Sequence, residues 1–141
     1  MRGRRVKYLL QHGWLMLEIS LKTRCYPTED KQAVARAMTS LFPDAVVRGD
    51  EELEALSSSV NTFAEQLKRQ RIRDAARAVM RRGIRDNKTT FRLNKQVAAV
   101  GKVSFSEEEH PLGDIFVEIS VDDINALIDD IAPNTRLEAS R

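Results

Sequence analysis

The sequence L-E-I-S-L-K-T-R-C, which spans residues 17–25, alternates apolar and polar side chains. Because successive side chains of a β-strand point to opposite faces, one set is expected to be buried and the other to meet water. The first set is Leu17, Ile19, Leu21, Thr23 and Cys25, and the second is Glu18, Ser20, Lys22 and Arg24. The pattern predicts a half-buried strand, ended by Pro27, in a sheet with one exposed face.

A helix and a second short strand are predicted next. Thr28 is the expected N-cap of this helix, and Pro43 ends it. Its apolar face consists of Val34, Ala37, Met38, Leu41 and Phe42. Residues 45–48 predict a short strand, which completes a β-α-β unit, whereas residues 51–58 predict a loop or a short helix.

A long helix is expected from Val60 to Gly83, with Ser59 as its cap. Two apolar stripes run along it, the first made of Val60, Phe63, Ala64 and Leu67 and the second of Ile72, Ala75, Ala76 and Val79. In one regular helix the stripes would be rotated from each other by roughly 130°. A straight helix cannot bury both against one flat surface, so we expect a kink, a break or a change of packing partner within residues 68–71.

The last part of the chain predicts further strands and a final helix. Residues 89–94 alternate as a strand, with Arg92 on the same polar face as Lys22 and Arg24. Residues 94–96 suit a turn, and residues 97–101 suit a tight connection. A hairpin is then expected between a strand containing Val103 and Phe105 and a strand containing Ile115, Val117 and Ile119. Ser120 and Asp123 resemble a capping box for a helix whose apolar face is Ile124, Leu127, Ile128 and Ile131.

These elements predict an α+β fold, a two-layer sandwich in which helices cover one face of a mainly antiparallel sheet of about five strands. We expect one domain over residues 16–135 and a polar tail at residues 136–141. The basic residues 1–15 are either an arm that touches nucleic acid or an extension upstream of a start at Met16. They lack a signal-peptide cleavage site and a run long enough to cross a membrane, and the single cysteine agrees with a cytoplasmic protein.

Charge is distributed unevenly along the chain, although the formal net charge is only +2. Residues 60–102 hold twelve basic and three acidic side chains, whereas residues 103–141 hold two basic and ten acidic ones. The densest basic run, residues 68–85, reads K-R-Q-R-I-R-D-A-A-R-A-V-M-R-R-G-I-R. Four of its arginines recur at four-residue spacing, where like charges destabilise a helix. Either the acidic block neutralises the basic one within the fold, or the basic run binds a polyanion.

Motifs of catalytic sites are missing from the sequence. The chain has no G-x-S-x-G, no H-E-x-x-H and no nucleotide-binding glycine loop, and Cys25 is expected to be an inert, buried thiol. Magnesium ligands for RNA cleavage could come from Glu107 to Glu109, from Asp122 and Asp123, or from Asp129 and Asp130. Their loop and helix-cap positions favour a solvated surface, so we expect no enzyme, no cofactor and no metal, with a nuclease as the least favoured alternative.

The basic run favours RNA as the polyanion. Arginine dominates it, as expected where planar, bidentate contacts to phosphate are made. Only Phe91 and Phe116 lie on strands where bases could stack, and Phe91 is assigned to the core. The residues therefore predict a non-catalytic protein that recognises structured RNA through its phosphates. The alternative is an assembly protein whose basic helix docks on an acidic protein surface.

Several ordered segments resemble a small archaeal family catalogued as RNA-binding and exosome-associated proteins. They are C-Y-P-T-E-D at 25–30, L-F-P-D-A at 41–45, K-R-Q-R-I-R-D-A-A-R at 68–77, F-R-L-N-K-Q-V-A-A-V-G-K-V at 91–103 and P-L-G-D-I at 111–115. The resemblance covers residues 16–135 and excludes residues 1–15. It implies a fold like that of the L-five type ribosomal protein, which holds the small RNA of the large subunit.

The family motifs and the helix pattern select one expected surface. Its RNA-binding residues would be Arg69, Gln70, Arg71, Arg73, Arg77, Arg81, Asn94, Lys95 and Gln96. The expected partners are structured RNA and an exosome-type or other RNA-processing complex. We expect a monomer or a homodimer that does not bind a membrane.

Overall fold

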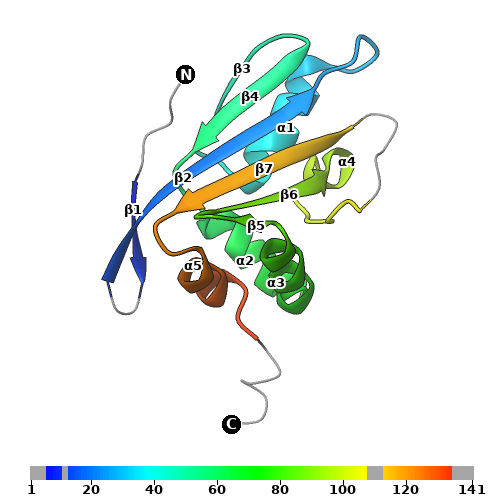
Figure 1. Ribbon diagram of the computed structural model, residues 1–141. Helices are drawn as coiled ribbons and strands as arrows, with labels where there is room; N and C mark the ends of the chain where they lie inside the picture. The colour runs from blue at the N-terminus through cyan, green and yellow to red at the C-terminus, as the bar shows by residue number, and fades with distance from the viewer. Residues whose placement is uncertain (1–5, 11–12, 108–112, 135–141) are drawn as a thin grey trace.

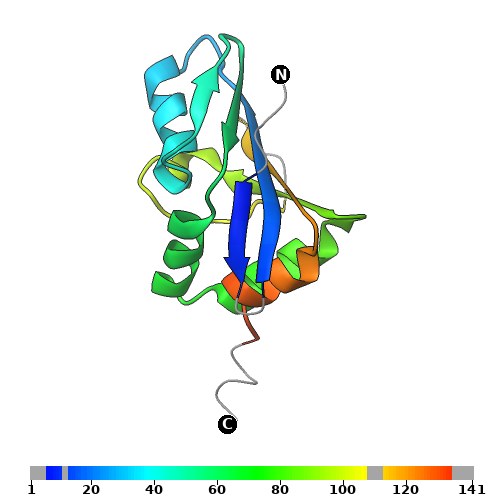
Figure 2. The same ribbon diagram turned by 90° about the vertical axis from the view of Figure 1, so that its left-hand side faces the viewer.

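The computed structural model describes residues 6–10, 13–107 and 113–134. In these residues helices cover one face of a single antiparallel sheet, and the opposite face of the sheet is open (Figures 1 and 2). The predicted α+β fold is confirmed. The sheet has seven strands in the described part of the chain, where about five were predicted.

Strand β2 (Gly13–Arg24) is paired along both of its edges. On one edge β1 (Val6–Leu10) lies beside its first half and β4 (Glu52–Ser57) beside its second half, while β7 (Asp114–Val121) lies on the other edge. The predicted strand at residues 17–25 is confirmed, but the strand begins earlier, at Gly13. Residues 6–10 and 13–15 therefore belong to strands, and the proposed division of the chain after residue 15 stays a prediction.

Three further strands complete the sheet. β3 (Val46–Arg48) pairs with β4, β6 (Lys88–Asn94) pairs with β7, and β5 (Ile84–Arg85) pairs with β6, which gives the order β3-β4-β2-β7-β6-β5. The prediction of a loop or short helix at residues 51–58 is wrong. Leu53 and Ala55 are buried and alternate with exposed glutamates, which is the pattern of a half-buried strand.

The helices are α1 (Lys31–Leu41), α2 (Asn61–Arg69), α3 (Arg73–Arg82), the single-turn α4 (Lys95–Ala98) and α5 (Ile124–Ile131). Four phenylalanine rings join α2 and the end of α1 to the sheet: Phe42 stacks on Phe63, Phe63 on Phe91, and Phe91 meets Phe105 edge-on, with centroids 5.5, 5.6 and 5.7 Å apart. Phe91 lies in the core as predicted. Among the described residues, no helix is both long and apolar enough to cross a membrane.

Three helix caps differ from the predicted ones. The N-cap of α2 is Val60 rather than Ser59, and the Val60 side chain makes no capping hydrogen bond. The N-cap of α1 is Asp30 rather than Thr28, because the Asp30 carboxylate accepts a hydrogen bond from the Gln32 backbone at 3.0 Å. The N-cap of α5 is Asp123 rather than Ser120, since the Asp123 carboxylate accepts from the Ala126 backbone at 3.1 Å. Aspartate accepts hydrogen bonds from the free backbone NH groups of a first turn as well as serine or threonine does. The sequence alone therefore does not show which of two neighbouring residues is the N-cap.

The predicted interruption of the long helix at residues 68–71 is confirmed. α2 ends at Arg69 and α3 begins at Arg73. Between them Arg71 is left-handed (φ 58°), its backbone NH donates to Lys68 O at 3.1 Å, and the Ile72 NH donates to Leu67 O at 3.1 Å. These bonds form a Schellman motif with an arginine where glycine is usual.

The second apolar stripe, which lies on α3, is shifted from its predicted position. Ala76 and Met80 are its buried members, Ile72 and Val79 pack partly against the core, and Ala75 is exposed. The break turns α3 relative to α2, so the buried face of α3 is set by its packing against α5 and β6 rather than by continuity with the first stripe.

The segment after β6 also departs from prediction. Asn94 caps α4, whose first residue is Lys95, so the predicted turn at residues 94–96 is the start of a short helix. Residues 103–105 make one isolated bridge, from Phe105 to Leu93, and do not form the first strand of a hairpin. β7 is paired instead with β2 and β6, since both neighbours offer a long alternating strand.

Asp44 ties the turn after α1 to the connection between β4 and α2. Its carboxylate accepts hydrogen bonds from the Ser58 backbone at 2.8 Å, from the Ser58 hydroxyl at 2.6 Å and from the Ser57 hydroxyl. Partial burial opposes ionisation of Asp44, but the hydrogen bonds outweigh it, so the pKa of Asp44 lies below its ordinary value. The stabilisation from this group is therefore present above the ordinary pKa and is lost as the pH falls through the lowered pKa.

Asp44→Asn is expected to reduce the free energy of unfolding at pH 7 by about 1 kcal/mol and to weaken its dependence on pH between about pH 5 and pH 2. Urea unfolding at a series of pH values measures both effects. Asp86→Asn, on the exposed β5–β6 turn, is the control and should follow the wild-type curve. An Asp44→Asn curve parallel to that of the wild type would contradict the assignment.

Arg71→Gly and Arg71→Val test the helix break. A left-handed residue with a Cβ is strained by about 1–2 kcal/mol, which glycine avoids and a β-branched side chain makes worse. Arg71→Gly should be at least as stable as the wild type, and Arg71→Val should lose about 1 kcal/mol or more, as measured by urea unfolding. A valine variant as stable as the glycine variant would show that the break has another geometry in solution.

Candidate nucleic-acid interface

The basic helices carry exposed arginines at and beyond their break. Arg69 has 71% of its side chain exposed and lies 3.8 Å from its ion-pair partner Glu65. Arg71 and Arg81 are exposed, and neither has an ion-pair partner among the residues that the structure describes. We call these three residues the arginine surface. It is the part of the predicted site that is open to an external anion.

Acidic residues neutralise another part of the basic run. Arg77 donates to the Asp129 carboxylate at 2.6 Å and to the Ala132 carbonyl at 3.3 Å, and only 20% of its side chain is exposed. Arg73 is half-buried and lines a hollow between α2, α3 and α5 that Asp130 also lines. The acidic helix α5 thus neutralises one flank of α3. Neutralisation within the fold is therefore shown for Arg77, whereas binding of a polyanion by the exposed arginines stays a prediction.

Three of the predicted polar site residues bind within the protein. The Gln70 amide donates to Val103 O at 2.9 Å and accepts from Val103 N at 2.7 Å, which fastens the helix break to the segment after α4. The Asn94 side chain accepts from Val97 N at 3.0 Å as the cap of α4. The third is Lys95, whereas Gln96 is exposed on α4. The predicted special position of Gln70 therefore has a structural reason.

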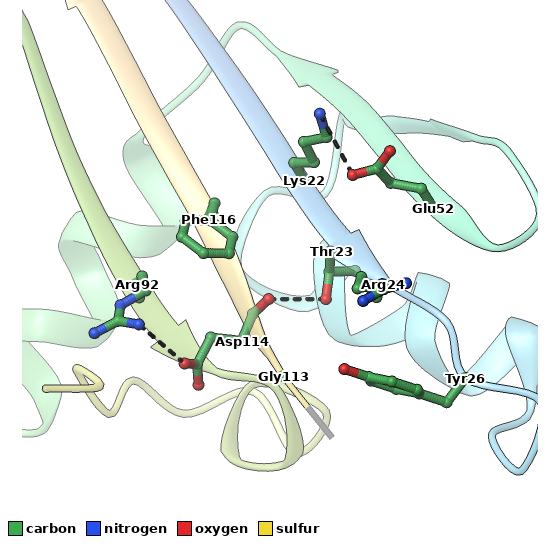
Figure 3. A pocket seen from close by; sticks show the side chains of 9 residues that line it. All are labelled: Lys22, Thr23, Arg24, Tyr26, Glu52, Arg92, Gly113, Asp114 and Phe116. Carbon is green, nitrogen blue, oxygen red and sulfur yellow. Dashed lines mark hydrogen bonds and ion pairs between the residues drawn. The ribbon is translucent and has the colours of Figure 1, made fainter. Parts of the chain in front are cut away.

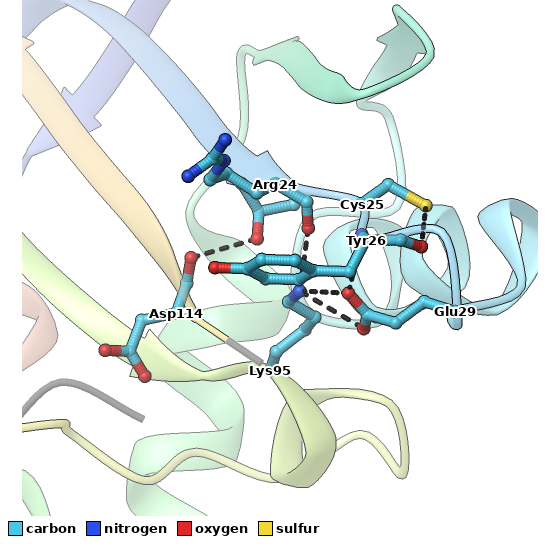
Figure 4. Close-up of polar contacts among 7 residues, drawn as sticks. Arg24, Cys25, Tyr26, Glu29, Lys95 and Asp114 are labelled. Atoms are coloured by element: carbon cyan, nitrogen blue, oxygen red, sulfur yellow. Dashed lines mark hydrogen bonds and ion pairs between the residues drawn. The ribbon is translucent and has the colours of Figure 1, made fainter. Parts of the chain in front are cut away.

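Lys95 is buried in an ion pair. Its ammonium lies 3.0 and 3.2 Å from the two Glu29 carboxylate oxygens and 2.7 Å from the Arg24 carbonyl, and 4% of its side chain is exposed. The Tyr26 ring lies between Lys95 and Arg24, at 5.6 and 5.5 Å from their charged groups (Figure 4). This cluster joins the end of β2 to α1 and α4. Sequence reasoning missed it because its members are far apart in the chain.

The open face of the sheet forms a second candidate surface. Phe116 projects from β7 with 54% of its surface exposed, opposite Lys22 of β2 and Arg92 of β6 (Figure 3). A hollow of about 190 Å³ lies beside it; its lining includes these three residues together with Arg24, Tyr26, Gly113 and Asp114. The alternating pattern had placed Lys22, Arg24 and Arg92 on this face. It had not shown that they surround an exposed aromatic ring.

Carboxylates form no metal-binding cluster in the described part of the chain. No group of three or more histidine, cysteine, aspartate or glutamate side chains there is placed to hold a metal. Asp122 accepts from the Met16 backbone, Asp123 caps α5 and Asp129 pairs with Arg77. Glu108 and Glu109, which the nuclease alternative also needs, lie outside the described residues.

The sequence profile of a family described as RNA binding matches residues 18–121, from β2 to β7. The UPF0201 protein of Methanocaldococcus jannaschii is 42% identical over 129 residues, which cover 85% of this chain and 75% of that protein. This chain belongs to the UPF0201 family. The predicted membership of an archaeal family whose profile is described as RNA binding is thereby confirmed, whereas the exosome association stays a prediction.

Other UPF0201 proteins are also similar to this chain. A UPF0200/UPF0201 protein of Archaeoglobus fulgidus is 36% identical over 124 residues, which are 85% of this chain but 38% of that longer protein. The crystal structure of a UPF0201 protein from Methanococcus jannaschii has a TM-score of 0.78 at 41% identity, covering 83% of this chain and 93% of that one. The fold described above is therefore the UPF0201 fold. The likeness to the L-five type ribosomal protein stays a prediction.

Lys95→Met is expected to reduce the free energy of unfolding by about 3–5 kcal/mol, because it leaves Glu29 charged and nearly buried without a partner. Lys95→Met with Glu29→Gln should recover most of this loss, since the glutamine oxygen can still accept from Tyr26 N. Lys31→Met, which breaks an exposed pair with Asp50, is the control and should cost less than about 1 kcal/mol. Chemical unfolding of the wild type, the two single variants of the pair and the double variant completes a cycle, and a double variant no more stable than Lys95→Met would contradict the pairing.

Proposed function

We propose that this protein binds structured RNA without catalysis and that the arginine surface, Arg69, Arg71 and Arg81, contacts its phosphates. The observation that carries the proposal is the exposure of these three guanidinium groups while their neighbour Arg77 is neutralised within the fold. Arginine holds phosphate oxygens through two parallel hydrogen bonds, and such contacts survive without base recognition. The match of an RNA-binding profile to residues 18–121 supports RNA as the anion.

The residues bound within the protein take a positioning role in this proposal. Gln70 holds the break that points α2 and α3 in different directions, and Arg77 fixes α3 against α5. Asn94 and Lys95 hold α4 in place. Gln96 is exposed on this helix, which lies in the same layer as α2 and α3. The RNA contacts would then come from the exposed arginines, with Gln96 as an additional hydrogen-bonding group.

The assembly alternative has one observation in its favour. The acidic helix α5 already docks on the basic helix α3 through Arg77 and Asp129, so a carboxylate-bearing protein surface is a chemically suitable partner for the remaining arginines. An exosome-type complex would offer both RNA and such surfaces. We propose RNA as the primary partner and membership of a complex of this type as a second step that depends on it.

Arg71→Gly combined with Arg81→Ala should weaken binding to an RNA hairpin by about three- to thirtyfold, because each surface charge pair is worth up to about 1 kcal/mol. The slope of log affinity against log salt should become shallower by about 0.7 to 0.9 for each phosphate that the variant no longer binds. Fluorescence anisotropy with a labelled hairpin at several salt concentrations measures both quantities.

Arg36→Ala combined with Arg48→Ala is the matched control. It removes one exposed positive charge from α1 and one from β3. Strand β3 lies at the opposite edge of the sheet from β5, which follows α3. Equal reductions in affinity in the two double variants would mean that net charge alone attracts RNA. Absence of hairpin binding by the wild type at low salt would refute the proposed function.

A further inference from the structure

We infer that Phe116 is a platform on which one unpaired RNA base stacks, while Lys22 and Arg92 contact the phosphates on either side of that base. The inference rests on the proposed RNA binding and adds a base-binding site on the opposite face of the sheet. It concerns the class of RNA that this protein selects, namely RNA that combines a duplex with unpaired nucleotides.

The surroundings of Phe116 distinguish it from an ordinary exposed apolar residue. Single exposed apolar side chains are common on proteins and carry no meaning by themselves. Phe116, however, has a long cationic side chain directly across from it on each neighbouring strand. Opposed side chains of an antiparallel sheet start only about 4.5–5.5 Å apart, so Lys22 and Arg92 flank the ring closely. A base can stack on the aromatic ring, and the phosphates on its two sides can each pair with one of the flanking cations.

The hollow beside Phe116 has the size of one ring system. Its volume of about 190 Å³ is below the roughly 300 Å³ at which pockets for whole small ligands begin. Figure 3 shows the Phe116 ring, Gly113 and Asp114 among the residues that line the hollow. Gly113 has φ 80°, and a Cβ placed there would lie 3.8 Å from the Tyr26 ring. The hollow therefore suits a single flat base that stays attached to a chain outside it.

Arg92 is held in place before any ligand arrives. Its guanidinium donates to the Glu107 carbonyl at 3.1 Å and lies 4.0 Å from the Asp114 carboxylate. Asp114 is itself buried, and one of its oxygens accepts from the Ser106 hydroxyl at 2.7 Å. Such a network reduces the side-chain entropy that Arg92 would lose on binding phosphate.

Lys22 is held less firmly than Arg92. Its ammonium lies 3.4 Å from Glu52 and 3.7 Å from Glu54, and about half of each of these side chains is exposed. Exposed pairs of this kind contribute little stability, so a phosphate can replace the glutamates as the partner of Lys22.

A short stretch of chain connects this site to the arginine surface. α3 ends at Arg82, and the two-residue strand β5 and its turn lead to Lys88, which faces the open side of the sheet together with Arg92. Arg82, Arg85 and Lys88 are exposed along this route around the β5 edge. An RNA backbone on α3 can therefore follow basic side chains around the edge to Phe116.

Phe116→Ala tests the inference with two RNAs, a hairpin with an unpaired loop and a blunt duplex with the sequence of its stem. Stacking on an aromatic side chain is worth about 1–3 kcal/mol per base, so Phe116→Ala should weaken hairpin binding by about five- to 150-fold and leave duplex binding unchanged. Phe116→Trp should retain hairpin binding. Val46→Ala, a similarly exposed apolar truncation on the same open face, is the control and should change neither affinity.

Ultraviolet crosslinking provides a direct readout. Irradiation of the wild-type complex with the hairpin, followed by proteolysis and mass spectrometry, should place a crosslinked nucleotide on Phe116. Thermal unfolding of Phe116→Ala confirms that the variant is folded, as expected for a side chain that is already half exposed. A crosslink elsewhere on the sheet, with none on Phe116, would contradict the site.

The outcomes separate this inference from the proposed function. If Phe116→Ala binds the hairpin as the wild type does while Arg71→Gly with Arg81→Ala does not, the base site is refuted and RNA binding stands. If the wild type binds neither RNA, both proposals fail. If Phe116 is instead covered by a second copy of this chain, sedimentation will show a wild-type dimer that Phe116→Ala dissociates, with hairpin affinity unchanged, and the base site is overturned.

Discussion

The pairing of β2 along both of its edges fixes which side chains face the helices and which face solvent. Leu17, Ile19 and Leu21 have no exposed surface, and a slip of one residue in register would exchange them for polar and charged neighbours. The same constraint keeps Lys22 on the open face of the sheet. The charged surface there is therefore as firmly specified as the core, although it contributes little to stability.

Charge in this fold is arranged by the packing of the acidic C-terminal part against the basic middle part. Asp129 on α5 neutralises Arg77 on α3, whereas the arginines at the helix break and at the end of α3 are left exposed. An isolated α3 would be strained by repulsion between its arginines, and docking of α5 relieves that repulsion on one flank only. The chain thus keeps the helix stable and still leaves several arginines exposed to solvent.

Two polar side chains, Gln70 and Lys95, hold together segments that are far apart in the sequence. Gln70 uses both ends of its amide to bind the backbone of Val103, and Lys95 reaches across to Glu29 and the end of β2. Both residues were predicted to contact RNA, and both instead bind groups within the fold. Two of the residues that the sequence assigned to an RNA-binding surface therefore have structural roles inside the protein.

Local sequence was sufficient for the strand at residues 17–25, for the amphipathic helices and for the interruption near residue 70, because each depends on periodicity within a short window. It was insufficient at residues 51–58, where the strand is defined by its pairing with β2, and at residues 103–105, where β7 pairs elsewhere. It placed Lys22 and Arg92 on one face, but their positions around Phe116 depend on strand order. By itself the sequence determined periodicity and charge. Tertiary structure decided which charges are neutralised, which strands are neighbours and which ring is exposed, since these depend on interactions between residues far apart in the chain.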